Sequence, residues 1–311
     1  MRTTVSLDTI SRLVEGRHEN PFELLGPHEV DHSGRKALAV RAYLPHTTQA
    51  WVVDPAHENR TLPMRRIHPA GLYEAICPPP NGNGSTRYML RVAAEDGRKT
   101  TTMHDPYSFP YLLTDFDRYL LNEGRHWQCY NRLGAQLRTI DGVAGVNFAV
   151  WAPNATGVSV IGDFNNWDAR RHPLRKHIPS GYWELFIPGL GEGALYKYQI
   201  RHNDWVFEKS DPFGFAAEVP PLTASKVANL DRHEWNDGEW MDRRPRTNWL
   251  EQPLSFYEVH LGSWRRPGDD PTRWLDYRML AHQLAEYCNE IGYTHVELLP
   301  VSEHPLSASW G

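Results

Sequence analysis

The sequence contains few cysteines and no long apolar run. Its 311 residues include three cysteines, Cys77, Cys129 and Cys288, which lie far apart and form no CxxC spacing. A sparse, odd number of cysteines is typical of a reducing compartment, where thiols stay unpaired. The N-terminus has no apolar stretch of signal-peptide length, and no segment is long enough to span a bilayer. The sequence therefore predicts a cytoplasmic location.

An excess of positive charge is also missing. Lys and Arg number 33 against 38 Asp and Glu, and the basic residues form no run. This balance argues against a nucleic acid or an anionic membrane as a partner. The sequence also lacks GxGxxG, P-loop, HExxH and GxSxG motifs, and its histidines are scattered. We therefore expect no cofactor and no metal site.

Aromatic residues, in contrast, are abundant, with 12 Trp, 14 Tyr and 10 Phe. Such rings fill the cores of β-sandwiches, and they also stack on flat apolar faces such as those of sugar rings. Composition alone leaves both roles open.

Four sequence blocks occur twice, in the same order, at offsets of 106 to 110 residues. The matching pairs are 40–45 with 148–153, 71–78 with 181–188, 88–92 with 196–200, and 105–107 with 211–213. Each copy contains short alternating stretches separated by Gly, Pro and Asn, the pattern of an immunoglobulin-like sandwich of about 100 residues. The chain is therefore predicted to be mainly β, with two tandem immunoglobulin-like β-sandwiches in residues 1–120 and 121–230.

A short helix is expected to lead the first sandwich. Residues 6–15 place Leu7, Ile10, Leu13 and Val14 on one helical face, and Gly16 is positioned to end the helix.

The pattern changes after Asp231. Residues 231–250 are rich in Trp, Arg, Asp and Asn, and they are predicted to form an irregular linker. A strand is expected over 256–261, a helix between an N-cap at Asp276 and Gly292, and a second strand over 293–300. These elements form one βαβ unit with parallel strands. Because one unit cannot cover both faces of a parallel sheet, residues 251–311 are expected to be the first βαβ unit of an incomplete (β/α)₈ barrel.

The second copy contains a candidate sugar site. A sugar site needs flat aromatic platforms and a few polar groups that reach hydroxyls, and Trp167, Trp205, Lys197 and Asn166 offer that set. The alternative is that both tryptophans belong to the core and that Lys197 is an exposed strand residue. The first copy has residues 53–57 in place of the Asn-Asn-Trp loop, so we expect no similar binding there.

Acidic residues near the ends of the two predicted barrel strands could carry chemistry. They are Glu258 on the first strand and Glu297 and Glu303 on or after the second, accompanied by His260 and His304. Active sites of such barrels lie at the C-terminal ends of strands, and glycoside chemistry needs two facing carboxylates. Two strands supply only a quarter of the barrel rim, so we expect structural roles for Glu258 and Glu297 and assign no catalytic residue.

Several motifs resemble those of bacterial 1,4-α-glucan (glycogen) branching enzymes. They lie at residues 20–26 (NPFELLG), 147–155 (NFAVWAPNA), 162–173 (GDFNNWDARRHP), 257–266 (YEVHLGSWRR) and 297–305 (ELLPVSEHP). The resemblance covers essentially the whole chain. It implies an N-terminal β module, a glycogen-binding-type β module and an α-amylase-type barrel. The second copy is also similar to the glycogen-binding module of the AMP-activated kinase β subunit, whose sugar-stacking tryptophans and lysine fall at Trp167, Trp205 and Lys197.

The resemblance implies transfer of α-1,4-glucan segments to α-1,6 positions, with an α-glucan as partner and a monomeric full-length parent. In this clan the catalytic carboxylates come from later barrel strands, which would follow Gly311. We therefore expect the 311 residues to be inactive alone. Two alternatives stay open: a non-catalytic glucan-binding protein, or another α-amylase-clan enzyme of the debranching or trehalose-forming type.

Overall fold

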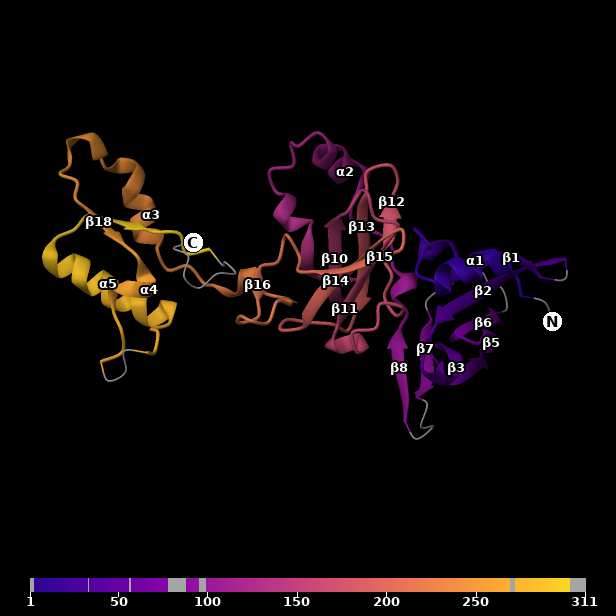
Figure 1. The fold of residues 1–311 in the computed structure, drawn as a ribbon. Helices are drawn as coiled ribbons and strands as arrows, with labels where there is room; N and C mark the ends of the chain where they lie inside the picture. The colour runs from indigo at the N-terminus through magenta and orange to yellow at the C-terminus, as the bar shows by residue number, and fades with distance from the viewer. Residues whose placement is uncertain are drawn as a thin grey trace. The chain divides into compact units, whose positions relative to one another are not determined.

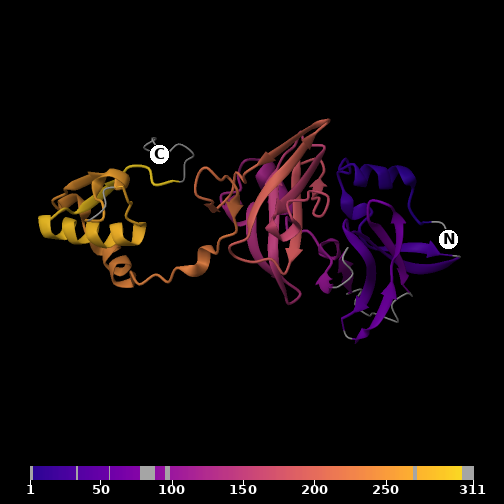
Figure 2. The same ribbon diagram turned by 60° about the horizontal axis from the view of Figure 1, so that its bottom comes forward.

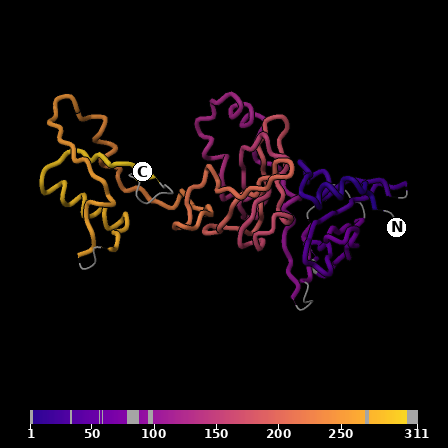
Figure 3. Tube along the Cα trace, in the orientation of Figure 1, coloured from indigo at the N-terminus to yellow at the C-terminus, as the bar shows by residue number. Residues whose placement is uncertain are grey.

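The computed structural model describes residues 3–32, 34–55, 57–77, 88–94, 99–268 and 272–302. The chain divides into two compact units, Met1–Leu230 and Asp231–Gly311. Figures 1 and 3 follow the chain through each unit.

The first copy of the repeat consists of two antiparallel sheets. One has the strand order β1–β2–β6–β5 and the other the order β4–β3–β7–β8. Helix α1 (Leu7–Val14) and the 3₁₀ turn η1 (Pro21–Glu23) precede them. The strands are β1 (Gly26–His32), β2 (Arg35–Tyr43), β3 (Thr47–Asp54), β4 (His57–Pro63), β5 (Arg65–His68), β6 (Leu72–Cys77), β7 (Met89–Ala94) and β8 (Thr100–His104).

The second copy repeats this arrangement. One sheet has the order β9–β10–β13–β12, and the other is β11–β14–β17–β16 with β15 also paired to β14. Helix α2 (Asp115–Asn122) and η3 (Cys129–Asn131) lead this copy. The strands, seen side by side in Figure 2, are β9 (Gly134–Ile140), β10 (Val143–Trp151), β11 (Gly157–Gly162), β12 (Arg175–His177), β13 (Tyr182–Pro188), β14 (Leu195–His202), β15 (Trp205–Lys209), β16 (Ala216–Ala217) and β17 (Ser225–Lys226).

Equivalent buried contacts recur in the two copies. The Tyr88 hydroxyl donates to the carboxylate of Asp105, and the Tyr196 hydroxyl donates to that of Asp211 at 2.7 Å. Burial raises the pKa of Asp105 to about 6 and also raises the pKa of Asp211. The predicted repeat and the mainly β, antiparallel architecture are thus confirmed. The boundary predicted after residue 120 falls inside α2 and stays a prediction.

Helix α1 joins the two copies. The Ser6 hydroxyl caps it by accepting the N–H of Thr9 at 3.2 Å. Ile10 and Leu13 are buried as predicted, but Leu7 is 75% exposed, because the first turn extends beyond the packed surface. One apolar cluster contains Ile10, Leu13, Leu24 and Tyr107 of the first copy together with Phe148, Val158 and Trp183 of the second. The two copies therefore share a continuous core.

The second unit contains a parallel strand pair and one long helix. Strand β18 (Phe256–Val259) pairs in parallel with β19 (His295–Leu298), and α5 (Tyr277–Ile291) lies between them in sequence. The Asp276 carboxylate caps α5 by accepting the N–H of Met279 at 2.8 Å, and Gly292 ends the helix with a φ of 89°. The predicted strand, helix and strand are confirmed. The described residues of this unit contain no further barrel strand, so the incomplete barrel stays a prediction.

The predicted linker over 231–250 is less irregular than expected. It contains α3 (Gly238–Arg243) between the 3₁₀ turns η5 (Leu230–Arg232) and η6 (Arg244–Arg246), and η7 (Trp249–Glu251) follows. These pieces are too short to produce a visible helical period in the sequence. None of the helices in the described part of the chain is long and apolar enough to cross a membrane.

Candidate functional site

A loop after strand β11 carries two of the predicted sugar-binding residues, Asn166 and Trp167. It begins at Gly162 with the 3₁₀ turn η4 (Asp163–Asn165) and returns at Pro173, which forms a β-bridge back to β11. In the first copy the equivalent segment is strand β4, which pairs with β3. The second copy thus replaces a strand with a loop at this position.

The side chain of Asn165, which is fully buried, holds this loop in shape. Its Oδ1 accepts the Gly162 N–H at 3.0 Å, and its Nδ2 donates to the Val160 carbonyl oxygen at 2.9 Å. Nδ2 also donates to Nδ1 of His172 at 2.8 Å, so this ring nitrogen carries no proton. Burial lowers the pKa of His172 to about 3. The ring is therefore neutral at pH 7, with its proton on Nε2.

The two exposed loop residues adopt an unfavourable backbone conformation. Asn166 and Trp167 lie in the left-handed region, with φ of 56° and 58°. For a bulky residue such as Trp167 this costs about 1–3 kcal/mol, whereas Asn adopts this region at a smaller cost. Trp167 is held by its N–H, which donates to the Gly162 carbonyl oxygen at 2.9 Å, and by Nε1–H, which donates to Asp163 Oδ1 at 2.8 Å. Its side chain nevertheless stays 36% exposed, a combination typical of ligand-binding positions.

Lys197 lies beside the start of this loop. It belongs to β14, where it pairs with Ile161 of β11. The adjacent Tyr196 pairs with Gly162, where the loop begins. Because Tyr196 and Tyr198 are fully buried in the core, the alternation of side chains places Lys197 on the outer face of the sheet. Lys197 and the loop therefore belong to the same end of the sheet.

Trp205 lies at the opposite end of this strand pair. It opens β15 and pairs with His202, five residues after Lys197 along β14. At about 3.4 Å per residue, that separation is about 17 Å along the strand. An odd number of residues also reverses the side-chain direction, so Trp205 and Lys197 project from opposite faces. The strand register places Lys197 at the end of β14 where the loop of Asn166 and Trp167 begins, whereas Trp205 lies at the other end.

Trp205 has an aromatic neighbour that the sequence analysis missed. The rings of Trp205 and Phe207 are parallel to within 11°, with their centroids 6.5 Å apart. Their side chains are 70% and 44% exposed. The alternation of aromatic residues along one edge strand was the signal that could have identified Phe207. Together the rings form a flat aromatic strip on β15.

The acidic residues of the second unit lie close to each other. Glu258 and Glu297 are direct neighbours in the ladder of β18 and β19, and both are exposed. His260 precedes α4 (Leu261–Trp264), and Glu303 and His304 lie outside the described residues. The part of the chain that the structure describes has no group of three or more His, Cys, Asp or Glu side chains able to hold a metal ion. The structural role of Glu258 and Glu297 stays a prediction.

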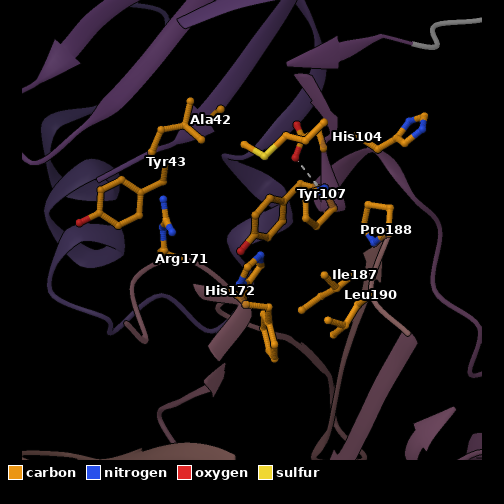
Figure 4. Close-up of a pocket in the computed structure, with 15 residues that line it drawn as sticks. Ala42, Tyr43, His104, Tyr107, Arg171, His172, Ile187, Pro188 and Leu190 are labelled. Carbon is orange, nitrogen blue, oxygen red and sulfur yellow. Dashed lines mark hydrogen bonds between the residues drawn. The ribbon is translucent and has the colours of Figure 1, made fainter. Parts of the chain in front are cut away.

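A cavity of about 230 Å³ lies between the two copies, as Figure 4 shows. Its walls include Tyr43, His104 and Tyr107 from the first copy and Phe164, Arg171, His172, Ile187 and Leu190 from the second. The sequence analysis missed this cavity, because it treated each copy separately and the cavity exists only where the copies meet.

Two family profiles match the first unit. Residues 6–107 match the family described as alpha-1,4-glucan branching enzyme GlgB, N-terminal domain. Residues 132–214 match carbohydrate-binding module 48, described as the isoamylase N-terminal domain. The two matches correspond to the two copies of the repeat.

Curated relatives match the chain over its whole length. The 1,4-alpha-glucan branching enzyme GlgB of Rhodopirellula baltica is 48% identical over 313 residues, which cover 100% of this chain and 42% of the relative. The enzyme of the same name from Paramagnetospirillum magneticum is 47% identical over 306 residues, covering 98% of this chain and 39% of the relative. A solved pullulanase from Anoxybacillus sp. LM18-11 aligns with 86% of this chain and 38% of its own, at a TM-score of 0.37 and 17% identity. The chain thus spans about two fifths of the length of these curated relatives.

Proposed function

The chain belongs, as an N-terminal portion, to the family of bacterial 1,4-alpha-glucan branching enzymes, and we propose that its second β module binds α-glucan for the parent enzyme. The observation that supports this most directly is the loop of Asn166 and Trp167, where a strained backbone presents an aromatic ring to solvent. The match of residues 132–214 to a carbohydrate-binding module adds independent support.

The proposed binding follows from the chemistry of the three neighbouring side chains. The indole of Trp167 offers a flat apolar face on which a glucose ring can stack. The Asn166 amide N–H and the Lys197 ammonium can donate hydrogen bonds to sugar hydroxyls. The Asn166 amide oxygen can accept a hydrogen bond from them. The strip of Trp205 and Phe207 offers a second stacking surface about 17 Å along the strand from Lys197. Because the two surfaces lie on opposite faces of the sheet, a long glucan that passes around the sheet edge can touch both, whereas a short oligosaccharide reaches only one.

Affinity electrophoresis in gels containing amylopectin tests this proposal on the 311-residue chain. We expect Trp167→Ala to weaken retention about tenfold, because stacking on an aromatic ring contributes about 1 kcal/mol or more. Trp127→Ala is the matched control, since Trp127 is 89% exposed but lies outside the loop and β15. Its retention should equal that of the unmodified chain.

The Trp205→Ala variant separates the two surfaces. If both bind one long glucan, this variant loses retention on amylopectin but keeps its affinity for maltose. Equal retention of the Trp167→Ala, Trp205→Ala and Trp127→Ala variants would refute the proposal.

For the parent protein we propose transfer of α-1,4-glucan segments to α-1,6 positions. In this chemistry a carboxylate attacks the anomeric carbon of an α-1,4 linkage, and a carboxylic acid protonates the 4-oxygen of the glucan that leaves. A 6-hydroxyl of another glucan, instead of water, then gives up its proton to the same carboxyl group and displaces the enzyme carboxylate. The described residues of the second unit form one βαβ unit, which we propose to be the start of the barrel that would carry such carboxylates. We therefore expect no branching activity from the 311 residues, which an iodine-staining assay on amylose can check. Cytoplasmic location and a monomeric parent stay predictions.

A further inference from the structure

The cavity between the two copies has features that surface stacking on Trp167 does not use. Its volume of about 230 Å³ lies just below the range of about 300–1,000 Å³ typical of drug-sized ligands. It therefore suits a smaller molecule, of the size of one sugar unit or slightly more. Figure 4 shows side chains from both copies surrounding it.

Two hydrogen-bond donors enter the cavity from the loop of the second copy. Nδ1 of His172 is occupied by Asn165, so its Nε2–H remains as a donor on the wall of the cavity. Arg171 lines the same wall, and its guanidinium has no hydrogen-bond or ion-pair partner among the described residues. The neighbouring Arg170 differs, because its guanidinium donates to the Asp168 carboxylate at 2.7 Å. Arg171 and His172 thus have donor capacity that a ligand can satisfy.

Much of the remaining wall is apolar and well fixed, although His104 and Asp105 also line the cavity. The Tyr107 hydroxyl donates to the Pro173 carbonyl oxygen at 3.0 Å, which holds the Tyr107 ring against the second copy. The Phe164 ring packs near His172, with centroids 5.7 Å apart, and Leu190 adds an aliphatic surface. A wall of rings and aliphatic groups with a few converging donors is what a sugar requires, because its ring faces are apolar and its edges carry hydroxyl oxygens.

We propose that this cavity binds the end of an α-glucan chain, with Arg171 and His172 donating to sugar hydroxyl oxygens. The proposal rests on the proposed glucan-binding function and adds a second, chain-end site to it. An uncharged ligand fits better than an anion, because the Asp105 carboxyl lines the same cavity as the Arg171 guanidinium and the imidazole of His172 carries no charge. The loop would then contact glucan on two sides, through Trp167 outside and through Arg171 within.

Maltose is the probe, because it offers a chain end and is too short to need both outer surfaces. It is titrated by calorimetry into the full 311-residue chain carrying Trp167→Ala, so that maltose bound at the outer indole does not contribute, and each cavity variant is made in this background. Arg171→Gln removes the free guanidinium, and Leu190→Trp fills the cavity. Arg170→Gln is the matched control, since it changes the adjacent arginine, which already has partners. Amylopectin retention is measured on the same variants.

We expect Arg171→Gln and Leu190→Trp to lower the maltose affinity at least tenfold, and Arg170→Gln to leave it within twofold. The His172 ring proton signals of the unmodified chain should also shift on addition of maltose, which tests the site without any variant. Unchanged maltose affinity in both cavity variants, or no shift at His172, would overturn the chain-end site. Loss of amylopectin retention in Trp167→Ala together with such a result would leave the proposed glucan-binding function intact.

Discussion

The two copies of the β module share a frame, the two packed antiparallel sheets of each copy, and the second copy has a loop that the first lacks. In the frame, Gly26 and Gly134 occupy equivalent positions with φ of 87° and 85°. A Cβ at Gly26 would lie 2.5 Å from the Tyr107 carbonyl oxygen, and one at Gly134 would lie 2.6 Å from that of Phe213. Because each glycine has no Cβ, the backbone at the end of the copy, at Tyr107 or Phe213, can pack against the start of the first strand of that copy.

The copies differ in the segment that follows their third strand, which is β3 in the first copy and β11 in the second. The first copy continues into β4, whose residues pair with β3 from Trp51 to Asp54. The second copy instead folds back through the loop that Asn165 and His172 hold together. We infer that the frame stabilises both copies, whereas the loop adds a glucan-binding surface to the second copy alone.

The largest effect is expected where the frame itself is broken. Gly134→Ala combines a positive φ with a contact to backbone that cannot move aside, and should lower the free energy of unfolding by about 2–5 kcal/mol. Gly26→Ala should behave similarly, because its geometry is equivalent. Gly124→Ala is the control: its φ is 67°, but nothing lies within 4 Å of its Cβ, so about 1 kcal/mol is expected. Urea unfolding of the three variants measures this. Equal losses at all three positions would show that the close contacts do not matter.

The second effect belongs to the loop. The pKa of His172 is lowered to about 3 in the folded chain, whereas an unfolded histidine titrates near 6.5. Below pH 6.5 the unfolded chain therefore binds a proton that the folded chain does not, and stability falls with decreasing pH. Between pH 7.5 and pH 4.5 this contribution is about 2.5 kcal/mol. His172→Gln keeps an acceptor for Asn165 but does not titrate, so its stability should fall less over this range. Parallel pH profiles for the two proteins would contradict the buried, neutral histidine.

The third effect is a loss of stability with increasing pH, opposite in direction to that of His172, and it arises from Asp105 in the frame. Burial raises the pKa of Asp105 to about 6, above the ordinary aspartate value of 3.8. The folded chain therefore binds a proton more readily than the unfolded chain, and this contribution is lost as pH rises through about 6. The loss between pH 4.5 and pH 7.5 is about 2 kcal/mol. Asp105→Asn should remove it, so the variant should gain stability over the unmodified chain as pH rises. Asp211→Asn should give a change of the same sign, since its pKa is raised by the same cause.

The frame was predictable because its signals are local and occur twice. Each Tyr–Asp pair lies within one copy. Gly71 and Gly181 mark the same turn, where the carbonyl oxygen accepts an N–H from the residue just after β2 in the first copy and just after β10 in the second. The cap at Asp276 was equally visible, because it depends on residues three positions apart. The short helix α3 was not, since six residues give no period.

The site was only partly predictable, because its geometry depends on register. The sequence placed Trp167, Lys197 and Trp205 in one set, but a hairpin in which Trp205 pairs with His202 turns Trp205 to the face opposite Lys197. Sequence spacing alone does not give the face on which Trp205 lies, because the face depends on which residue of β14 pairs with Trp205. The cavity between the copies was beyond reach for another reason, since Tyr107 and His172 meet there only through packing of the two copies.

The smallest effect separates the shape of the loop from its chemistry. Asn166 has a φ of 56°, so Asn166→Gly relieves backbone strain and should change the free energy of unfolding by about 0.5 kcal/mol in the stabilising direction. Asn166→Ala keeps the strain and should cost about 1 kcal/mol. Both variants remove the amide. If the amide contacts a sugar hydroxyl, both lose amylopectin retention to the same extent although their stabilities move in opposite directions. If retention instead follows stability, the Asn166 amide does not contribute to binding. The loop then binds glucan through the Trp167 ring that its conformation exposes, and this exposed indole is the feature of the loop that the first copy lacks.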